Sequence, residues 1–274
     1  MLFSRAQIFR SSLCCLVLSL ASPLVAQIVS KDPDQPVQEL METEVVYPQE
    51  KHELQLTSTT RLEKSSTGMM TFSSPVTIEF GLSDSWQVGI EWGFAQSQNG
   101  DLPGHTTRGL GDMELDTKYS FMKIRGSRYH AALSFRLGLP TGNVEQGLGE
   151  GKLELEPTLI CARDLPRFHG AQVFTQVGLN IPFAIHSSGE PVSKQAIWNI
   201  GAFVPYKQVR MILEATTQAD THNGMSVQLT PGLVVKAPGG FEIGMGFYQP
   251  IGVQDRKQHF VLKITHEFGG GKEL

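Results

Sequence analysis

Two runs of strict alternation lie between residues 75 and 96, on either side of a short break at residues 83–85. Period-2 alternation predicts β-strands with two unlike sides. An apolar, aromatic outside and a small, polar inside are typical of strands in a membrane β-barrel. In the second run, large apolar residues alternate with small or polar ones: Trp86, Val88, Ile90, Trp92 and Phe94 against Gln87, Gly89, Glu91, Gly93 and Ala95.

The same alternation divides the remaining chain into about twelve segments, and most approach the roughly 9–11 residues that a tilted membrane strand needs. Phe174 and Phe203 are expected to point inward, against the pattern of their segments. The sequence therefore predicts an all-β fold, an antiparallel transmembrane β-barrel of the outer-membrane type with about 12 strands. The segments are 52–64, 73–82, 86–96, 110–123, 128–139, 152–162, 170–183, 195–206, 209–218, 225–236, 241–250 and 257–268.

The lengths of the links between segments support a barrel independently. Links after even-numbered segments are short, for example residues 83–85, 207–208 and 237–240, whereas links such as 97–109 and 140–151 are long. Short turns on one rim and long loops on the other are expected of an outer-membrane barrel. An even strand number then places both chain ends on the short-turn, periplasmic side.

The beginning of the chain predicts export. Arg5 and Arg10 precede a short apolar run at residues 13–20, and a cut after Ala26 would complete a signal peptide of residues 1–26. Residues 27–51 are polar and contain prolines, which indicates a periplasmic N-terminal segment. Two alternatives stay open for it: entry into the barrel mouth, or a disordered lead-in. Residues 52–268 then form the barrel, and residues 269–274 form a C-terminal tail.

Charge and cysteine content exclude several kinds of partner and structure. The chain has 23 basic and 27 acidic residues, and loss of the signal peptide removes two arginines, which leaves a net charge of −6. This balance gives no reason to expect a nucleic-acid partner. Cys161 is the one cysteine after residue 26, so no intrachain disulfide can form in the mature chain. No later apolar run is long enough for a helical span, so only a closed barrel could cross a membrane.

The inward faces carry charges of both signs with acids in excess, which predicts a polar lumen. Rings of charged side chains set ion preference in channels. We expect a mid-height constriction in which Arg136 and Lys118 face four carboxylates, those of Glu91, Glu114, Asp116 and Glu156. The alternative is that these charges only solvate or cross-link the interior, as in small closed barrels.

The other motifs in the sequence do not predict a phosphate-binding, metal-binding or catalytic site. Glycines 147, 149 and 151 before Lys152 fail the spacing of a phosphate loop and predict a flexible external loop instead. The eight histidines lack metal-ligand spacing, so neither metal nor cofactor is expected. His222 and Ser226 invite comparison with an esterase, but Asn223 and Gly224 between them are typical turn residues. We therefore do not expect an enzyme.

Several short glycine-rich motifs occur in a characteristic order. They are residues 79–84 leading into 86–94, residues 109–112 leading to Lys118 and Tyr119, residues 137–142, and residues 230–233 followed by 241–248. In order and spacing they resemble the outer-membrane β-barrel transporters of the phenol-degradation meta-pathway type, over about residues 40–268. The resemblance implies a barrel that carries small compounds, including hydrophobic ones, across the outer membrane.

These features together predict a channel or transporter in the outer membrane of a Gram-negative-type bacterium. It would pass small molecules, including hydrophobic or aromatic ones, by passive diffusion. A non-conducting structural barrel or adhesin, and an exported β-sandwich, are the alternatives. The expected partners are outer-membrane lipids, small-molecule solutes and the barrel-assembly machinery. Barrels of this kind usually end on an aromatic residue that helps assembly, and Phe268 fits that role although residues 269–274 follow it.

Overall fold

The computed structural model describes residues 35–64, 70–99, 106–184, 193–221, 224–251 and 258–269. The predicted signal peptide, most of the C-terminal tail and His222 lie outside the described residues. The side chain of Phe94 is likewise outside them, although its backbone belongs to a described strand.

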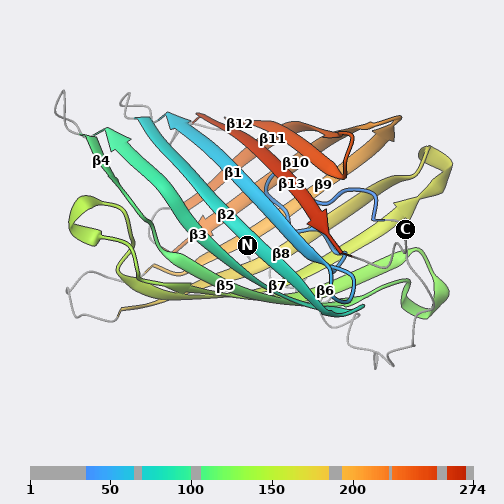
Figure 1. Cartoon of the computed structure of the whole chain (residues 1–274), viewed down its shortest axis with the longest axis horizontal. Helices are drawn as coiled ribbons and strands as arrows, with labels where there is room; N and C mark the ends of the chain where they lie inside the picture. The colour runs from blue at the N-terminus through green and yellow to red at the C-terminus, as the bar shows by residue number, and fades with distance from the viewer. Residues whose placement is uncertain are drawn as a thin grey trace, which may run out of the picture. The chain divides into compact units, whose positions relative to one another are not determined.

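The strands form one closed antiparallel barrel (Figure 1). Twelve of the thirteen strands make the ring, which closes where β1 pairs with both β13 and β2. The predicted twelve-stranded antiparallel barrel is therefore confirmed. The strands are β1 (Leu54–Lys64), β2 (Met70–Ser83), β3 (Trp86–Asn99), β4 (Thr106–Gly109), β5 (Met113–Phe121), β6 (Tyr129–Leu139), β7 (Lys152–Leu165), β8 (Ala171–Ala184), β9 (Gln195–Tyr206), β10 (Val209–Asp220), β11 (Gly224–Lys236), β12 (Phe241–Ile251) and β13 (Gln258–Phe268).

The thirteenth strand, β4, lies in the predicted link 97–109, just before the predicted segment 110–123. The chain pairs with β3 as β4, leaves the ladder at residues 110–112, and pairs with β3 again as β5. Across the interruption the Gly111 N–H still donates to the Gly93 carbonyl at 2.7 Å. The predicted segment 110–123 corresponds to the single strand β5, whereas the predicted link 97–109 is partly strand, because β3 extends to Asn99 and pairs with β4.

The two rims differ as the link lengths predicted. The first residue of β1, Leu54, pairs with the last residue of β13, Phe268, so the barrel begins and ends on one rim. The tight β2–β3 turn lies on this rim, where Ser83 pairs with Trp86. The β6–β7 link at residues 140–151 lies on the opposite rim. One link there is short, because Asp220 and Gly224 pair directly where β10 turns into β11.

The outward face of the barrel is apolar and carries exposed aromatic residues, among them Trp86, Trp198, Phe135, Phe247 and Phe268. Two indole N–H groups on this face have acceptors on a neighbouring strand. The indole N–H of Trp86 donates to the Thr117 hydroxyl at 2.7 Å, and that of Trp198 donates to the Thr175 hydroxyl at 2.9 Å. An indole N–H without an acceptor would be costly in hydrocarbon, so these pairs suit a lipid-facing surface.

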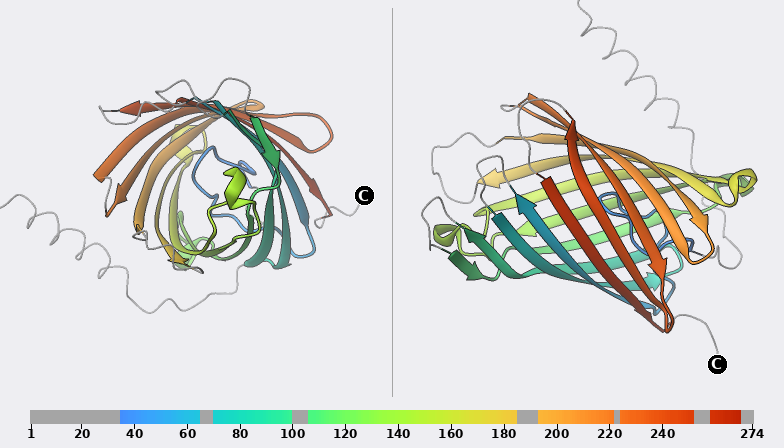
Figure 2. Two further views of the ribbon diagram at one scale, coloured as in Figure 1. Left: turned by 90° about the vertical axis from the view of Figure 1, so that its left-hand side faces the viewer. Right: turned by 90° about the horizontal axis from the view of Figure 1, so that it is seen from above.

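The inside is polar and largely filled. Phe174 and Phe203 are 4% and 0% exposed, so they do point inward against the pattern of their strands. Residues 35–53, which we call the luminal segment, run inside the ring of strands (Figure 2). Val37, Leu40 and Met41 in this segment are each at most 2% exposed. In the described part of the chain, no helix has the length and apolarity needed to cross a membrane.

Candidate functional site

The luminal segment contains no strand, so its backbone groups need other partners. Wall side chains supply them. The carboxylate of Glu214 on β10 accepts the N–H of Met41 at 3.0 Å and that of Thr43 at 2.8 Å. The carboxylate of Glu242 on β12 accepts the N–H of Gln38 at 2.8 Å. Inward carboxylates of the wall therefore hold the backbone of the segment.

A recess in the wall receives the side chain of Met41. Gly232 on β11 and Gly246 on β12 are cross-strand partners, and Gly244 lies two residues away. A β-carbon at Gly246 would lie 2.9 Å from the Met41 sulfur, and one at Gly232 would lie 2.8 Å from its Cγ. Such distances exclude any side chain there while Met41 is in place. The small residues on these inward faces therefore accommodate the luminal segment.

The segment is also fixed near the short-turn rim. The Tyr47 hydroxyl accepts a hydrogen bond from the Gln172 amide at 2.7 Å, and the same amide nitrogen donates to Asp164 at 2.8 Å. The other oxygen of Asp164 lies 2.8 Å from Nε2 of the buried His130. Because β6, β7 and β8 each contribute one of these wall residues, the cluster joins three strands to the segment.

Arg136 on β6 is the main cationic group at mid-lumen. Its guanidinium lies 3.1 Å from Glu44 of the luminal segment, 3.2 Å from Glu114 on β5 and 3.9 Å from Glu156 on β7. Three carboxylates thus surround one arginine. One of them comes from the segment and two from neighbouring strands.

The six residues predicted to form a constriction are only partly brought together. Arg136 contacts Glu114 and Glu156, and Glu91 and Asp116 line the same cavity. Lys118 does something different. The residue is 3% exposed, and its ammonium group donates to the Val45 carbonyl at 3.0 Å, so it binds the luminal segment.

A second set of contacts fixes the acidic residues of the segment. Glu39 forms an ion pair with Lys263 on β13 at 3.0 Å. Glu42 accepts a hydrogen bond from the Tyr248 hydroxyl on β12. Burial raises the pKa of Glu42 to about 7, and the neighbouring Arg61 opposes this shift while Glu214 adds to it. The segment therefore carries a carboxyl group that titrates near neutral pH.

Two cavities lie between the described residues of the lumen. The inner cavity, of about 230 Å³, lies between the luminal segment and the wall. The outer cavity, of about 290 Å³, lies against residues 147–150 of the β6–β7 link. Arg61, Glu91 and Glu114 line both. The two cavities therefore adjoin at these side chains.

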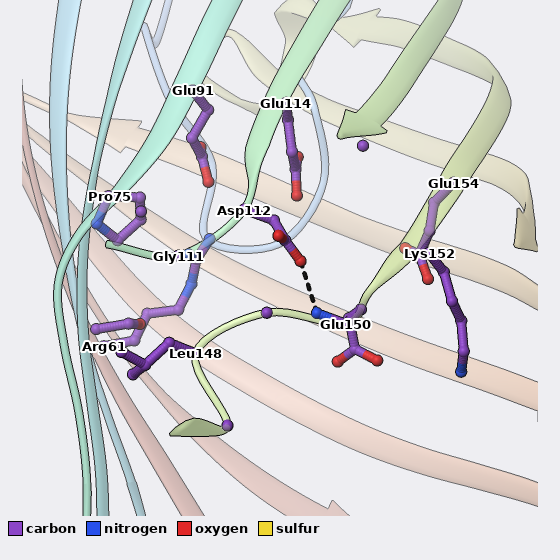
Figure 3. A pocket seen from close by; sticks show the side chains of 15 residues that line it. Arg61, Pro75, Glu91, Gly111, Asp112, Glu114, Leu148, Glu150, Lys152 and Glu154 are labelled. Carbon is purple, nitrogen blue, oxygen red and sulfur yellow. Dashed lines mark hydrogen bonds between the residues drawn. The ribbon is translucent and has the colours of Figure 1, made fainter. Parts of the chain in front are cut away.

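Residues 140–151 are folded over the lumen at the long-loop rim (Figures 2 and 3). Both oxygens of Asp112 accept backbone N–H groups from this loop, at 2.7 Å from Gly142 and at 2.7 Å from Glu150. The side chain of Leu148 is 2% exposed. The loop predicted to be flexible is thus held by one carboxylate and by a buried leucine.

Sequence reasoning missed several luminal residues: Glu39, Glu42, Glu44 and Arg61. Arg61 could have been found, because Gln55, Thr57, Thr59 and Arg61 form a continuous polar face of the first strand. The three acids of the luminal segment carry no periodic signal, since the segment contains no strand. Their positions depend on tertiary contacts with the wall. Within the described ranges no group of histidine, cysteine and acidic residues could hold a metal ion.

Comparisons with known proteins support the fold. No family model matches the chain, and no curated protein sequence matches it. The chain resembles the COG4313 outer membrane channel from Pseudomonas putida F1, with 14% identity, a TM-score of 0.60, and coverage of 87% of this chain and 100% of that chain. At this identity the likeness shows the fold.

Two porins have the same architecture. The NanC porin matches with 8% identity and a TM-score of 0.55, over 77% of this chain and 98% of that chain. The KdgM porin matches with 10% identity and a TM-score of 0.51, over 78% of this chain and 99% of that chain. The chain therefore has the fold of outer-membrane β-barrel channels.

Proposed function

We propose that this protein is an outer-membrane channel that passes small solutes by passive diffusion through its lumen. The observation that carries the proposal is that two cavities adjoin inside the barrel. They meet at Arg61, Glu91 and Glu114 and extend from the β6–β7 loop to the luminal segment. A barrel built only for mechanical support has no need of adjoining cavities lined by charged side chains. The fold shared with channels and porins supports the same function.

The outward face supports insertion in the outer membrane. Its large apolar residues are exposed, and the indole N–H groups of Trp86 and Trp198 have acceptors on the barrel itself. A closed barrel leaves no unpaired strand edge in lipid. Outer-membrane lipids and the barrel-assembly machinery are therefore the proposed macromolecular surroundings. Phe268, exposed at the end of β13, remains the candidate assembly signal.

The side chains that line the two cavities indicate which class of solute can pass. Charged and polar side chains dominate both cavities, and apolar ones such as Leu148, Met41 and Ile197 are few. Transfer of a hydrophobic solute into such a lining would desolvate charges without compensation. The lining therefore favours small polar solutes over the hydrophobic or aromatic ones predicted from the sequence. Membership of the phenol-degradation meta-pathway type stays a prediction from the sequence motifs.

A non-conducting barrel is the second candidate, and a specific observation favours it. The luminal segment and residues 140–151 obstruct the lumen from opposite rims. In that case the long loops would carry the function.

Bilayer conductance and liposome swelling separate the two candidates. The purified protein is expected to give discrete single-channel events of small conductance, because the cavities are narrow. It is also expected to admit small polar solutes into liposomes more slowly than a general porin does. Absence of both signals from protein whose migration on gels shifts on heating, as folded barrels do, would contradict the channel.

A further inference from the structure

We propose that one arc of the short-turn rim binds the phosphate groups of anionic phospholipids, such as phosphatidylglycerol, in the inner leaflet of the outer membrane. The inference rests on the proposed membrane location, and it names the class of lipid and the residues that bind it. It does not depend on whether the lumen conducts. Three observations carry it: a cluster of exposed cations, aromatic side chains that hold two of them at the outer face, and an unusual backbone conformation at several of them.

Exposed basic residues gather at three consecutive turns of this rim. Strands β5 to β10 are neighbours in the ring, so the β5–β6, β7–β8 and β9–β10 turns follow one another along one end of the barrel (Figure 1). Because adjacent strands lie about 4.8 Å apart, neighbouring turns of this kind are separated by only about 10 Å. We use the name basic rim for five exposed residues at these turns: Lys123, Arg125, Arg163, Arg167 and Lys207.

The basic rim has little opposing charge. Asp164 is the one acidic residue in the sequence around the three turns, over residues 119–130, 162–170 and 205–210. Its two carboxylate oxygens already contact the buried His130 and the Gln172 amide. None of the five cations forms an ion pair with any residue that the structure describes. The basic rim therefore presents positive charge to whatever lies beside it.

Aromatic residues hold part of this charge at the lipid-facing side. Tyr129 on β6 and Arg163 on β7 are direct cross-strand partners, and the guanidinium carbon lies 5.1 Å from the centroid of the tyrosine ring. The ammonium group of Lys207 lies 5.5 Å from the centroid of the Tyr206 ring. Both tyrosines are exposed on the outward face of the barrel. Because tyrosine is favoured at membrane interfaces, these cation–π contacts place positive charge at the level of lipid headgroups.

The backbone of the turns indicates that the cations are there for a purpose. Lys123, Arg125 and Lys207 have φ values of 45°, 53° and 57°. This left-handed region is uncommon for residues with a β-carbon, and turns usually place Gly, Asn or Asp there. Glycine fills such positions in other turns of this chain, at Gly224 and Gly239. Strained positions occupied by long basic side chains point to a role for those side chains outside the turn itself.

Lipid phosphate is the anion that fits the basic rim. A guanidinium group binds two phosphate oxygens through parallel hydrogen bonds, and an ammonium group adds charge. Clusters of roughly four to eight Lys and Arg residues beside a membrane are typical of sites for anionic lipids. The inner leaflet follows from the position of the rim, because β1 begins and β13 ends there, as expected of the periplasmic side. A zwitterionic lipid would bind less well, since its own ammonium group is repelled by the same cations.

Native mass spectrometry of the purified protein tests the proposal. The protein in mild detergent is mixed with equal amounts of phosphatidylglycerol and phosphatidylethanolamine that have identical acyl chains, and the retained lipids are counted. We expect a preference of about tenfold for phosphatidylglycerol, and this preference should fall at high salt because exposed charges are screened. The double variant Arg125→Gln, Arg167→Gln should reduce it to about twofold. The control Lys64→Gln, Lys194→Gln removes two exposed cations from the opposite rim and should leave it unchanged.

The outcomes separate this inference from the proposed function. If the protein inserts into lipid vesicles but retains both lipids equally, or if both double variants lose the preference equally, the lipid site is wrong while the membrane location stands. If the protein fails to insert, the membrane location is wrong and the inference falls with it. Stronger retention of lipid A, the phosphorylated lipid of the outer leaflet, than of phosphatidylglycerol would overturn the assignment to the inner leaflet. If heat-modifiable migration on gels shows that a double variant does not fold, Arg163→Gln decides, with an expected threefold loss of preference, about a third of the tenfold preference of the wild type.

Discussion

The guanidinium of Arg136 lies 3.1 Å from the carboxylate of Glu44, and this ion pair joins the barrel wall to the luminal segment. Glu114 and Glu156 complete a group of three acids around the arginine. One cation therefore links strands β5, β6 and β7 to a segment that is 92 residues away in the sequence. Two of the six residues predicted to set ion preference, Arg136 and Lys118, thus serve a second purpose, because they also hold the segment.

Arg136→Ala should make the channel more selective for cations. The substitution removes the cation that balances three luminal carboxylates. A unit charge about 4 Å from an ion in water is worth about 1 kcal/mol, so the permeability ratio of K⁺ to Cl⁻ should rise about fivefold. The reversal potential in a KCl gradient measures this ratio. Arg128→Ala, on the exposed turn before β6, removes the same charge as a control. An unchanged reversal potential would rule out Arg136 as a determinant of selectivity.

Gly246→Val should displace the luminal segment. The new side chain would overlap with Met41, and overpacking of this kind costs about 1–3 kcal/mol. We expect larger single-channel conductance and easier proteolysis of the segment.

The double variant Met41→Ala, Gly246→Val provides the control for this contact. Removal of the methionine side chain makes room for the valine, so conductance should return toward that of the wild type. Residues in direct contact show coupling of about 0.5–3 kcal/mol. If the effects of the two substitutions on conductance are additive, the Met41 side chain does not occupy the recess at Gly246.

Much of the barrel could be predicted from the sequence, because each strand repeats a period-2 pattern that the membrane imposes. The β9 boundaries, Gln195 to Tyr206, coincide with the prediction. The break at residues 110–112 could not be predicted, since it follows from a local contact between Gly111 and Gly93. The site was predictable only in part. Inward positions such as Arg136 follow from alternation, whereas the partner Glu44 belongs to a segment without periodicity.

Asp112→Ala should release the loop at residues 140–151. Both carboxylate oxygens accept N–H groups of this loop, so the substitution removes two charge-assisted hydrogen bonds, worth about 1.5–3 kcal/mol each. We expect the outer mouth to widen and conductance to fluctuate more. Asp84→Ala, at the exposed β2–β3 turn, is the matched control. Equal conductance traces for both variants would show that the loop does not restrict the outer mouth.

The luminal segment should become less firmly held as the pH rises through neutrality. Burial raises the pKa of Glu42 to about 7, so between its ordinary value of 4.5 and about 7 the seated segment binds more protons than the released one. A group with a raised acid pKa stabilises the seated state below this range and loses that contribution as it ionises. Conductance should therefore increase between about pH 5 and pH 8. Glu42→Gln should flatten this dependence, and an unaltered slope would exclude Glu42 as its source. The charged groups acting on Glu42 are Arg61, Glu214, Lys263 and Arg136.

Thr117→Val should destabilise the barrel from its outer face. The Thr117 hydroxyl accepts the Trp86 N–H at 2.7 Å and donates to the Gln87 carbonyl at 3.0 Å. Its loss leaves an indole N–H in hydrocarbon without an acceptor, which should cost about 1–3 kcal/mol. Urea unfolding of the protein in lipid vesicles measures the change.

The background variant Trp86→Phe isolates the contribution of the indole. In that background Thr117→Val removes a hydroxyl that no longer has an N–H to accept, so its cost should fall by more than half. An equal cost in both backgrounds would mean that the hydroxyl stabilises the barrel only through the Gln87 carbonyl. If Thr117→Val lowers the free energy of unfolding only in the wild-type background, the polar atoms of the outer surface need hydrogen-bond partners on the barrel itself. A surface that faces hydrocarbon has this requirement, whereas on a surface that faces water the solvent would supply the partner.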